Sequence, residues 1–105
     1  VKMSYMYKGI KHFKEAIKYK KDFANGYLFL AKVYLDLGKN FDEVILLAQK
    51  GLKLAPESEY APLAHFILAD AYNRLGQRDK YHEELQKGRQ LQQKLEKNNQ
   101  KNNNN

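Results

Sequence analysis

Three histidines are the first candidates for chemistry in this sequence, because imidazole is a common metal ligand and general base. They are His12, His65 and His82, and no two of them have the spacing that places a pair of metal ligands on one helix. His82 is followed by Glu83 and Glu84, but the second histidine of a zinc-protease helix is missing. We therefore expect no metal site, and we expect His65 to be a packing residue.

Nucleophiles and phosphate-binding loops are equally scarce. The only serines are Ser4 and Ser58, and neither is flanked by glycines as in the nucleophile elbow of a hydrolase. The six glycines are scattered and form no loop that could hold a phosphate. There is no cysteine to form a disulfide or to bind zinc as a thiolate. The sequence therefore predicts a protein that is not an enzyme and that needs no cofactor.

Lysines and tyrosines are the remaining groups that could bind a ligand. The net charge is +7, and residues 1–23 hold seven lysines against two acids. A basic end of this kind can attract acidic proteins, nucleic acid or anionic lipid, and the alternative is a solvated lysine face on a surface helix. The eight tyrosines could stack on bases beside these lysines. However, Tyr27, Tyr34 and Tyr72 fall at positions that helix packing explains.

The elements that would position these residues repeat along the chain. Residues 27–38, Tyr-Leu-Phe-Leu-Ala-Lys-Val-Tyr-Leu-Asp-Leu-Gly, match residues 65–76, His-Phe-Ile-Leu-Ala-Asp-Ala-Tyr-Asn-Arg-Leu-Gly, at a constant offset of 38. In both segments the apolar residues recur at helical spacing. The final glycine, Gly38 or Gly76, provides the left-handed residue that ends many helices. Each segment is therefore predicted to be a helix that ends at its glycine.

A second helix is expected after each of these glycines. Asn40 and Glu43 have the spacing of a capping box, in which an N-terminal acceptor is followed three residues later by an acid. Small residues then follow at helical spacing as far as Ala55, and Pro56 ends the helix. Residues 57–60 form the connection to the next repeat.

The two ends of the chain are predicted on the same basis. Asp79 is expected to cap a long last helix, whose apolar residues recur at intervals of three and four up to Leu95. The N-terminal part is predicted as the end of one helix, up to Lys8, followed by a helix over about residues 10–20. Residues 97–105 contain only Lys, Asn and Gln, so we expect them to be disordered. The prediction is an all-α protein with five helices, the first incomplete.

The paired segments resemble tetratricopeptide repeats. The signature of that family is an aromatic residue, Leu beside a small residue, and Tyr in the first helix, with a closing Pro after the second. The matching residues are Tyr27, Leu30, Ala31, Tyr34 and Pro56 in one repeat, and His65, Leu68, Ala69 and Tyr72 in the next. The period of 38 is longer than the usual tetratricopeptide period of about 34. The second repeat also lacks the closing Pro.

The resemblance covers roughly residues 5–95 and implies a fold and a domain organisation. The implied fold is all-α, with antiparallel helix hairpins stacked as a short right-handed α-solenoid. Residues 1–23 would be a partial repeat or capping helices, and residues 24–58 would be one hairpin. Residues 59–96 would be a second hairpin with an extended last helix, followed by the tail at 97–105.

The resemblance also implies that the first helix of each repeat lines a concave groove. Ten side chains would lie there: Asn25, Leu28, Phe29, Lys32, Asp36, Leu63, Phe66, Ile67, Asp70 and Asn73. Apolar anchors beside polar groups suit an extended peptide or a docked helix. The alternative is that Phe29, Phe66 and Ile67 belong to the core between helices. Chaperone binding is not expected, because Leu28 and Phe66 occupy positions where a lysine-rich carboxylate clamp would be needed.

The predicted function is a non-catalytic protein–protein interaction scaffold that binds a protein or peptide partner in this groove. Two alternatives stay open. One is a structural role through self-association, which the long apolar stripe of the last helix favours. The other is contact between the basic N-terminus and nucleic acid or an anionic membrane. The sequence has no apolar stretch long enough to span a bilayer and begins with no signal peptide, so we expect a soluble cytoplasmic protein.

Overall fold

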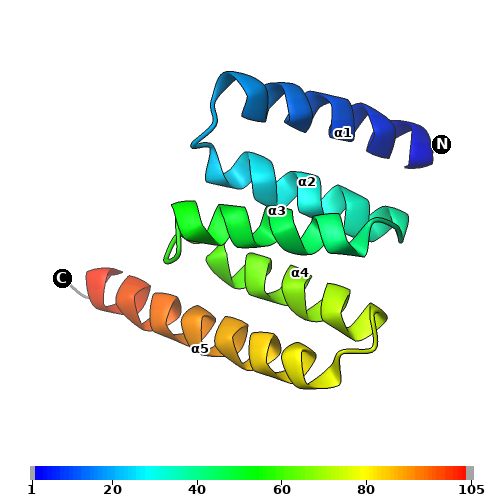
Figure 1. Cartoon of the computed structure of the whole chain (residues 1–105). Helices are drawn as coiled ribbons and strands as arrows, with labels where there is room; N and C mark the ends of the chain where they lie inside the picture. Colours follow the sequence, from blue (N-terminus) through cyan, green and yellow to red (C-terminus); the bar gives the residue numbers. More distant parts are fainter. Residues whose placement is uncertain (1, 104–105) are drawn as a thin grey trace.

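The computed structural model of the protein describes residues 2–103 and consists of five α-helices. The helices are α1 (Lys2–Tyr19), α2 (Ala24–Leu37), α3 (Phe41–Leu54), α4 (Ala61–Arg74) and α5 (Arg78–Asn103). Residues 2–103 contain no strand, so the all-α prediction is confirmed. Figure 1 shows that the helices lie against one another in chain order, and α4 also contacts α2. None of the helices in this range is both long enough and apolar enough to cross a membrane.

The two predicted glycine ends are closed in the same way. Gly38 and Gly76 both have left-handed backbones, with φ of +73° and +77°. The N–H of each glycine donates to the carbonyl three residues earlier. The next N–H donates to the carbonyl of a tyrosine, from Lys39 to Tyr34 at 3.4 Å and from Gln77 to Tyr72 at 2.8 Å. These bonds satisfy carbonyls that a helix end would otherwise leave without partners.

The start of α3 differs from the capping box that the sequence predicts. Asn40 adopts a left-handed backbone with φ of +59°, and its side chain makes no capping hydrogen bond. Asparagine tolerates this conformation better than most residues, and here it turns the chain between α2 and α3. Asp42 and Glu43 lie in the first turn of α3, where the helix dipole stabilises a negative charge.

The two ends of the chain are more helical than predicted. α1 is one continuous helix that passes through Gly9, where a break was expected. α5 begins at Arg78, so Asp79 lies in its first turn and is not the cap. α5 also continues through residues 97–103, which we expected to be disordered, and residues 104–105 lie outside the described part. Extending a formed helix by one residue costs much less than starting one, and Lys and Gln are good helix formers.

The core is made by the three central helices. The buried apolar side chains belong to α2, α3 and α4, and they include Leu30, Tyr34, Val44 and Leu68. The large apolar and aromatic side chains of α1 and α5 are partly buried or exposed. Ala31 and Ala69, which are equivalent residues of the internal repeat, are both buried.

The two hairpins share one close contact between their helices. In the first, the side chain of Leu28 packs on Gly51, so that a methyl group added to Gly51 would lie 2.5 Å from Leu28 Cδ2. In the second, the ring of Phe66 packs on Gly88, and an added methyl group would lie 2.6 Å from its Cε1. Each glycine therefore lets a large side chain of the facing helix approach its backbone.

Candidate functional site

The predicted groove residues do not form a single surface. Leu28 and Ile67 are 1% and 2% exposed, so the prediction that they line a groove is wrong. Leu28 fills the space over Gly51, and Ile67 belongs to the central core cluster. The apolar pattern places Leu28 and Phe29 on the inner half of α2, but it does not say which of the two faces the partner helix.

Phe29 belongs to a row of three aromatic rings, which we call the aromatic row. Its ring centroid lies 5.7 Å from that of Phe13 in α1 and 5.5 Å from that of Tyr60 in the connection before α4. These distances are typical of attractive aromatic pairs. Phe13 and Phe29 are half-buried, and Tyr60 is 37% exposed. The row therefore joins three segments of the chain and still presents aromatic surface.

Sequence reasoning missed two of these three rings. Phe13 fits the apolar spacing of its own helix, and that pattern gives no sign of a contact with Phe29. Tyr60 lies in a connection, where no helical period marks it. The sequence signal for Tyr60 is its position directly before the first helix of the second repeat. A residue at that position lies close to the preceding helices.

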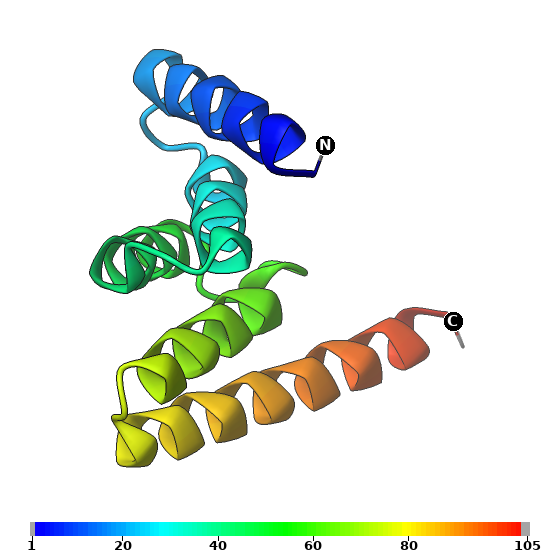
Figure 2. The same cartoon turned by 90° about the vertical axis from the view of Figure 1, so that its right-hand side faces the viewer.

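Phe66 and Leu63, two further predicted residues, line a hollow of about 400 Å³ between α4 and α5. We call it the α4–α5 hollow. Its lining residues are Glu59, Pro62, Leu63, Phe66, Gln92, Leu95, Glu96 and Asn99. Figure 2 shows the C-terminal part of α5 running past the start of α4. The lining residues place the hollow between these two segments. Because Glu59 precedes Tyr60 in the chain, the hollow and the aromatic row meet at the connection before α4.

The charged groove residues pair within their own helices. Lys32 Nζ lies 2.5 Å from Asp36 Oδ1, and Arg74 Nε lies 3.5 Å from Asp70 Oδ1. These side chains are more than 40% exposed, so such pairs add little stability. Among the polar groove residues, Asn25 is half-buried and Asn73 is exposed. None of these residues lines the α4–α5 hollow.

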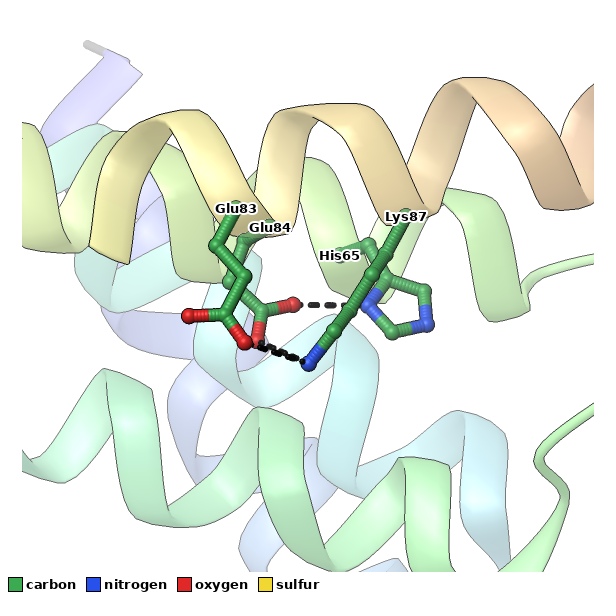
Figure 3. A network of polar contacts seen from close by, with 4 residues as sticks. All are labelled: His65, Glu83, Glu84 and Lys87. Atoms are coloured by element: carbon green, nitrogen blue, oxygen red, sulfur yellow. Dashed lines mark hydrogen bonds and ion pairs between the residues drawn. The ribbon is translucent and has the colours of Figure 1, made fainter. Parts of the chain in front are cut away.

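His65 lies in a polar cluster that joins α4 to α5 (Figure 3). Its Nδ1 donates to Glu84 Oε2 at 2.7 Å, since an ionised carboxylate can only accept. Lys87 Nζ lies 3.6 Å from Glu84 and 3.2 Å from Glu83. Partial burial raises the pKa of Glu84, but the hydrogen bond from His65 and the charge of Lys87 outweigh it and leave that pKa below its usual range. This cluster therefore fastens the two helices with a polar contact.

The basic end of the chain presents tyrosines beside lysines. Tyr5 and Tyr7 are exposed. Lys8 Nζ lies 5.8 Å from the centre of the Tyr5 ring, and Lys39 Nζ lies 5.0 Å from that of Tyr7. Lys39 also donates to the Tyr7 hydroxyl at 3.0 Å. Contacts of this length are typical of cation–π pairs, so part of the exposed aromatic surface is already covered by ammonium groups of the same chain.

No protein-family model matches this chain, and no curated protein is significantly similar to it. The tetratricopeptide resemblance therefore stays a prediction from the repeated residues. Within residues 2–103, no three His, Asp or Glu side chains gather into a group that could hold a metal ion.

Proposed function

We propose that this chain is a non-catalytic protein-interaction module, of the tetratricopeptide type, that binds a segment of a partner protein across the aromatic row. The observation on which the proposal rests is the meeting of Phe13, Phe29 and Tyr60 at 5.5–5.7 Å while all three rings stay partly exposed. Aromatic side chains supply large contact areas and dominate many protein interfaces.

The exposure of Phe29 supports this reading because its neighbours in sequence are buried. Leu28 and Leu30 both lie in the core. A large ring that stays partly exposed between two buried residues keeps some apolar area that the fold itself does not cover. A partner segment laid across α2 would remove this area from water, and each buried square ångström contributes about 25 cal/mol.

The repeated construction of the two hairpins supports the solenoid part of the proposal. Gly38 and Gly76 close their helices with equivalent hydrogen bonds, and α2 contacts α4. Successive hairpins in a right-handed solenoid of this family have their first helices side by side, and these helices form the binding face. The aromatic row includes a residue of the first such helix, α2.

The experiment that tests the proposal is affinity capture of cellular proteins on the immobilised chain, with a matched pair of variants. Tyr60→Ala and Phe29→Ala should each lower the yield of captured partners about tenfold or more, the effect of removing an interface hot spot. Tyr19→Ala is the control, because Tyr19 is 87% exposed and lies outside the aromatic row. Circular dichroism of each variant confirms that it stays helical.

One result would contradict the proposed binding surface. If Tyr19→Ala abolished capture and Tyr60→Ala had no effect, the aromatic row would not be the binding surface. The function would then lie with the basic end of the chain.

The basic end is the second candidate surface, and one observation favours it. Tyr5 and Tyr7 stay exposed beside Lys8 and Lys39. A surface of this composition suits acidic partners such as nucleic acid or an anionic membrane. Binding to RNA or to anionic vesicles that weakens steeply with salt, and that Lys11→Glu reduces, would favour this candidate. Self-association is a further candidate, because the large apolar and aromatic side chains of α1 and α5 are partly buried or exposed.

A further inference from the structure

The α4–α5 hollow combines an apolar floor with an acidic edge. The floor consists of Pro62, Leu63, Phe66 and Leu95. The edge has one glutamate on each side, Glu59 from the connection before α4 and Glu96 from α5. A hollow of about 400 Å³ lies near the lower end of the range of roughly 300–1,000 Å³ for ligand pockets. Its size and lining suit the seating of large side chains from a partner.

The two edge glutamates differ from the other acids in this half of the molecule. Residues 57–103 contain seven acids. Four of them pair with a lysine or arginine of the chain: Glu57, Asp70, Glu83 and Glu84. Asp79 lies in the first turn of α5, where the helix dipole stabilises its charge. The remaining two, Glu59 and Glu96, form no ion pair with any side chain in the described range, and both line the hollow.

The sequence around Glu96 explains why its charge has no partner on α5 within the described residues. On a helix, the nearest neighbours of a side chain lie three and four residues away in each direction. For Glu96 all four of these positions hold neutral amides: Gln92, Gln93, Asn99 and Gln100. By contrast, Glu83 has Lys87 four residues later. Although α5 is rich in lysine, its sequence leaves the charge of Glu96 open to a group from outside.

We propose that the α4–α5 hollow binds a basic segment of a partner protein. In this complex a large apolar side chain lies between Leu63, Phe66 and Leu95, and flanking Lys or Arg residues pair with Glu59 and Glu96. The inference rests on the proposed function and adds to it the charge of the bound segment. The net charge of +7 does not oppose it, because charges farther away than about 8 Å are largely screened at physiological ionic strength.

Three synthetic peptides that differ only in charge test this inference. Each is a short helix-forming peptide with one Trp and one Leu at fixed positions, flanked by Lys, by Gln or by Glu. Because the chain contains no tryptophan, the emission of the peptide reports its own burial. We expect the Lys peptide to bind about three- to thirtyfold more tightly than the Gln peptide, which is the effect of two solvent-exposed ion pairs. The Glu peptide should bind most weakly.

Variants of the protein locate the effect. The double substitution Glu59→Gln and Glu96→Gln keeps the shape of the edge and should bring the affinities of the Lys and Gln peptides together. Glu83→Gln is the matched control, since Glu83 is an exposed acid of α5 that does not line the hollow. It should leave the preference for the Lys peptide unchanged. Phe66→Ala should weaken the binding of all three peptides.

Three results would overturn the inference, and they bear differently on the proposed function. Equal affinities of the three peptides would refute the charge preference but leave apolar binding, and thus the proposed function, intact. Failure of every peptide to bind would refute the inference, and capture with Tyr60→Ala would then decide the proposed function independently. Self-association that the Glu59→Gln and Glu96→Gln pair abolishes would mean that the basic α1 of a second copy fills the hollow.

Discussion

The hairpins α2–α3 and α4–α5 are built on the same contact but differ in what covers them. Leu28 packs on Gly51 in the first, and Phe66 packs on Gly88 in the second. Leu28 is buried, whereas Phe66 is half-buried and lines a hollow.

The cause of this difference lies in the neighbouring helices. α4 packs on both α2 and α3, while α5 packs on α4 alone among the described helices. The same internal contact is therefore part of the core in the hairpin on which α4 packs, and it lies beside a hollow in the hairpin α4–α5.

The largest expected effect of a single substitution compares the two equivalent tyrosines. Tyr34 is 7% exposed, and Tyr72 is half-buried. Tyr34→Ala should lower the free energy of unfolding by about 3–5 kcal/mol, as large aromatic truncations in cores do. Tyr72→Ala should cost roughly half of that, because water already reaches the ring. Urea denaturation followed by circular dichroism measures both, and equal losses would mean that the two hairpins are equally covered.

A smaller effect is expected at the two glycines. In Gly51→Ala the new methyl group would lie 2.5 Å from Leu28 Cδ2 and 3.1 Å from the carbonyl oxygen of Ala24, which belongs to the backbone. Overpacking costs about 1–3 kcal/mol, against a gain of about 1 kcal/mol from replacing a helical glycine. We therefore expect a net loss of up to about 2 kcal/mol.

Gly88→Ala is the matched test in the second hairpin. There the atoms nearest to the new methyl group belong to the ring of Phe66. This ring can turn toward the α4–α5 hollow, so the change in stability should stay within about 0.5 kcal/mol of zero. Thermal unfolding of the pair measures the difference. A Gly88→Ala protein less stable than Gly51→Ala would contradict the view that the second contact is the looser one.

The smallest expected effect concerns acid, and it should appear in the second hairpin. The pKa of Glu84 lies below its ordinary value of 4.5, because the contacts with His65 and Lys87 outweigh the effect of burial. The ionised carboxylate therefore stabilises the fold above pH 4.5, and this contribution is lost as the pH falls through the lowered pKa.

Amide hydrogen exchange at decreasing pH checks this expectation, with intrinsic rates corrected at each pH. Protection of the α4–α5 hairpin should fall more than that of α2–α3 below pH 4.5. In Glu84→Gln this additional loss should be absent. Equal acid sensitivity of both hairpins in the unchanged protein would show that the His65–Glu84 contact contributes little.

The sequence predicts the helices and their ends well because these depend on local chemistry. Gly38 and Gly76 end their helices, and Pro56 follows the end of α3, as their backbone preferences require. The capping role of Asn40 was wrong because the short turn after Gly38 needs a second left-handed residue there. The helical state of residues 97–103 was missed because composition alone ignores a helix already formed before them.

The candidate site could be predicted only in part, because it depends on how helices face one another. Helical periodicity cannot decide which of the adjacent Leu28 and Phe29 turns inward. Tyr60 and Glu59 lie in a connection, where no pattern indicates contact with the aromatic row or the hollow. The sequence does show that the helix neighbours of Glu96 are neutral. This pattern indicates a charge available to a partner once the hollow is known.

The packing of each helix mainly on its neighbour in the chain has a consequence for folding. Contacts between neighbours are close in sequence, and chains dominated by such contacts fold within microseconds to milliseconds. The buried side chains belong to α2, α3 and α4, so α1 and α5 are the segments that should open at the lowest free energy. The basic end lies on α1, and α5 forms one side of the hollow. A ligand that binds either surface only in its folded form will therefore stabilise that end of the chain against opening. This stabilisation grows with the ratio of the ligand's concentration to its dissociation constant.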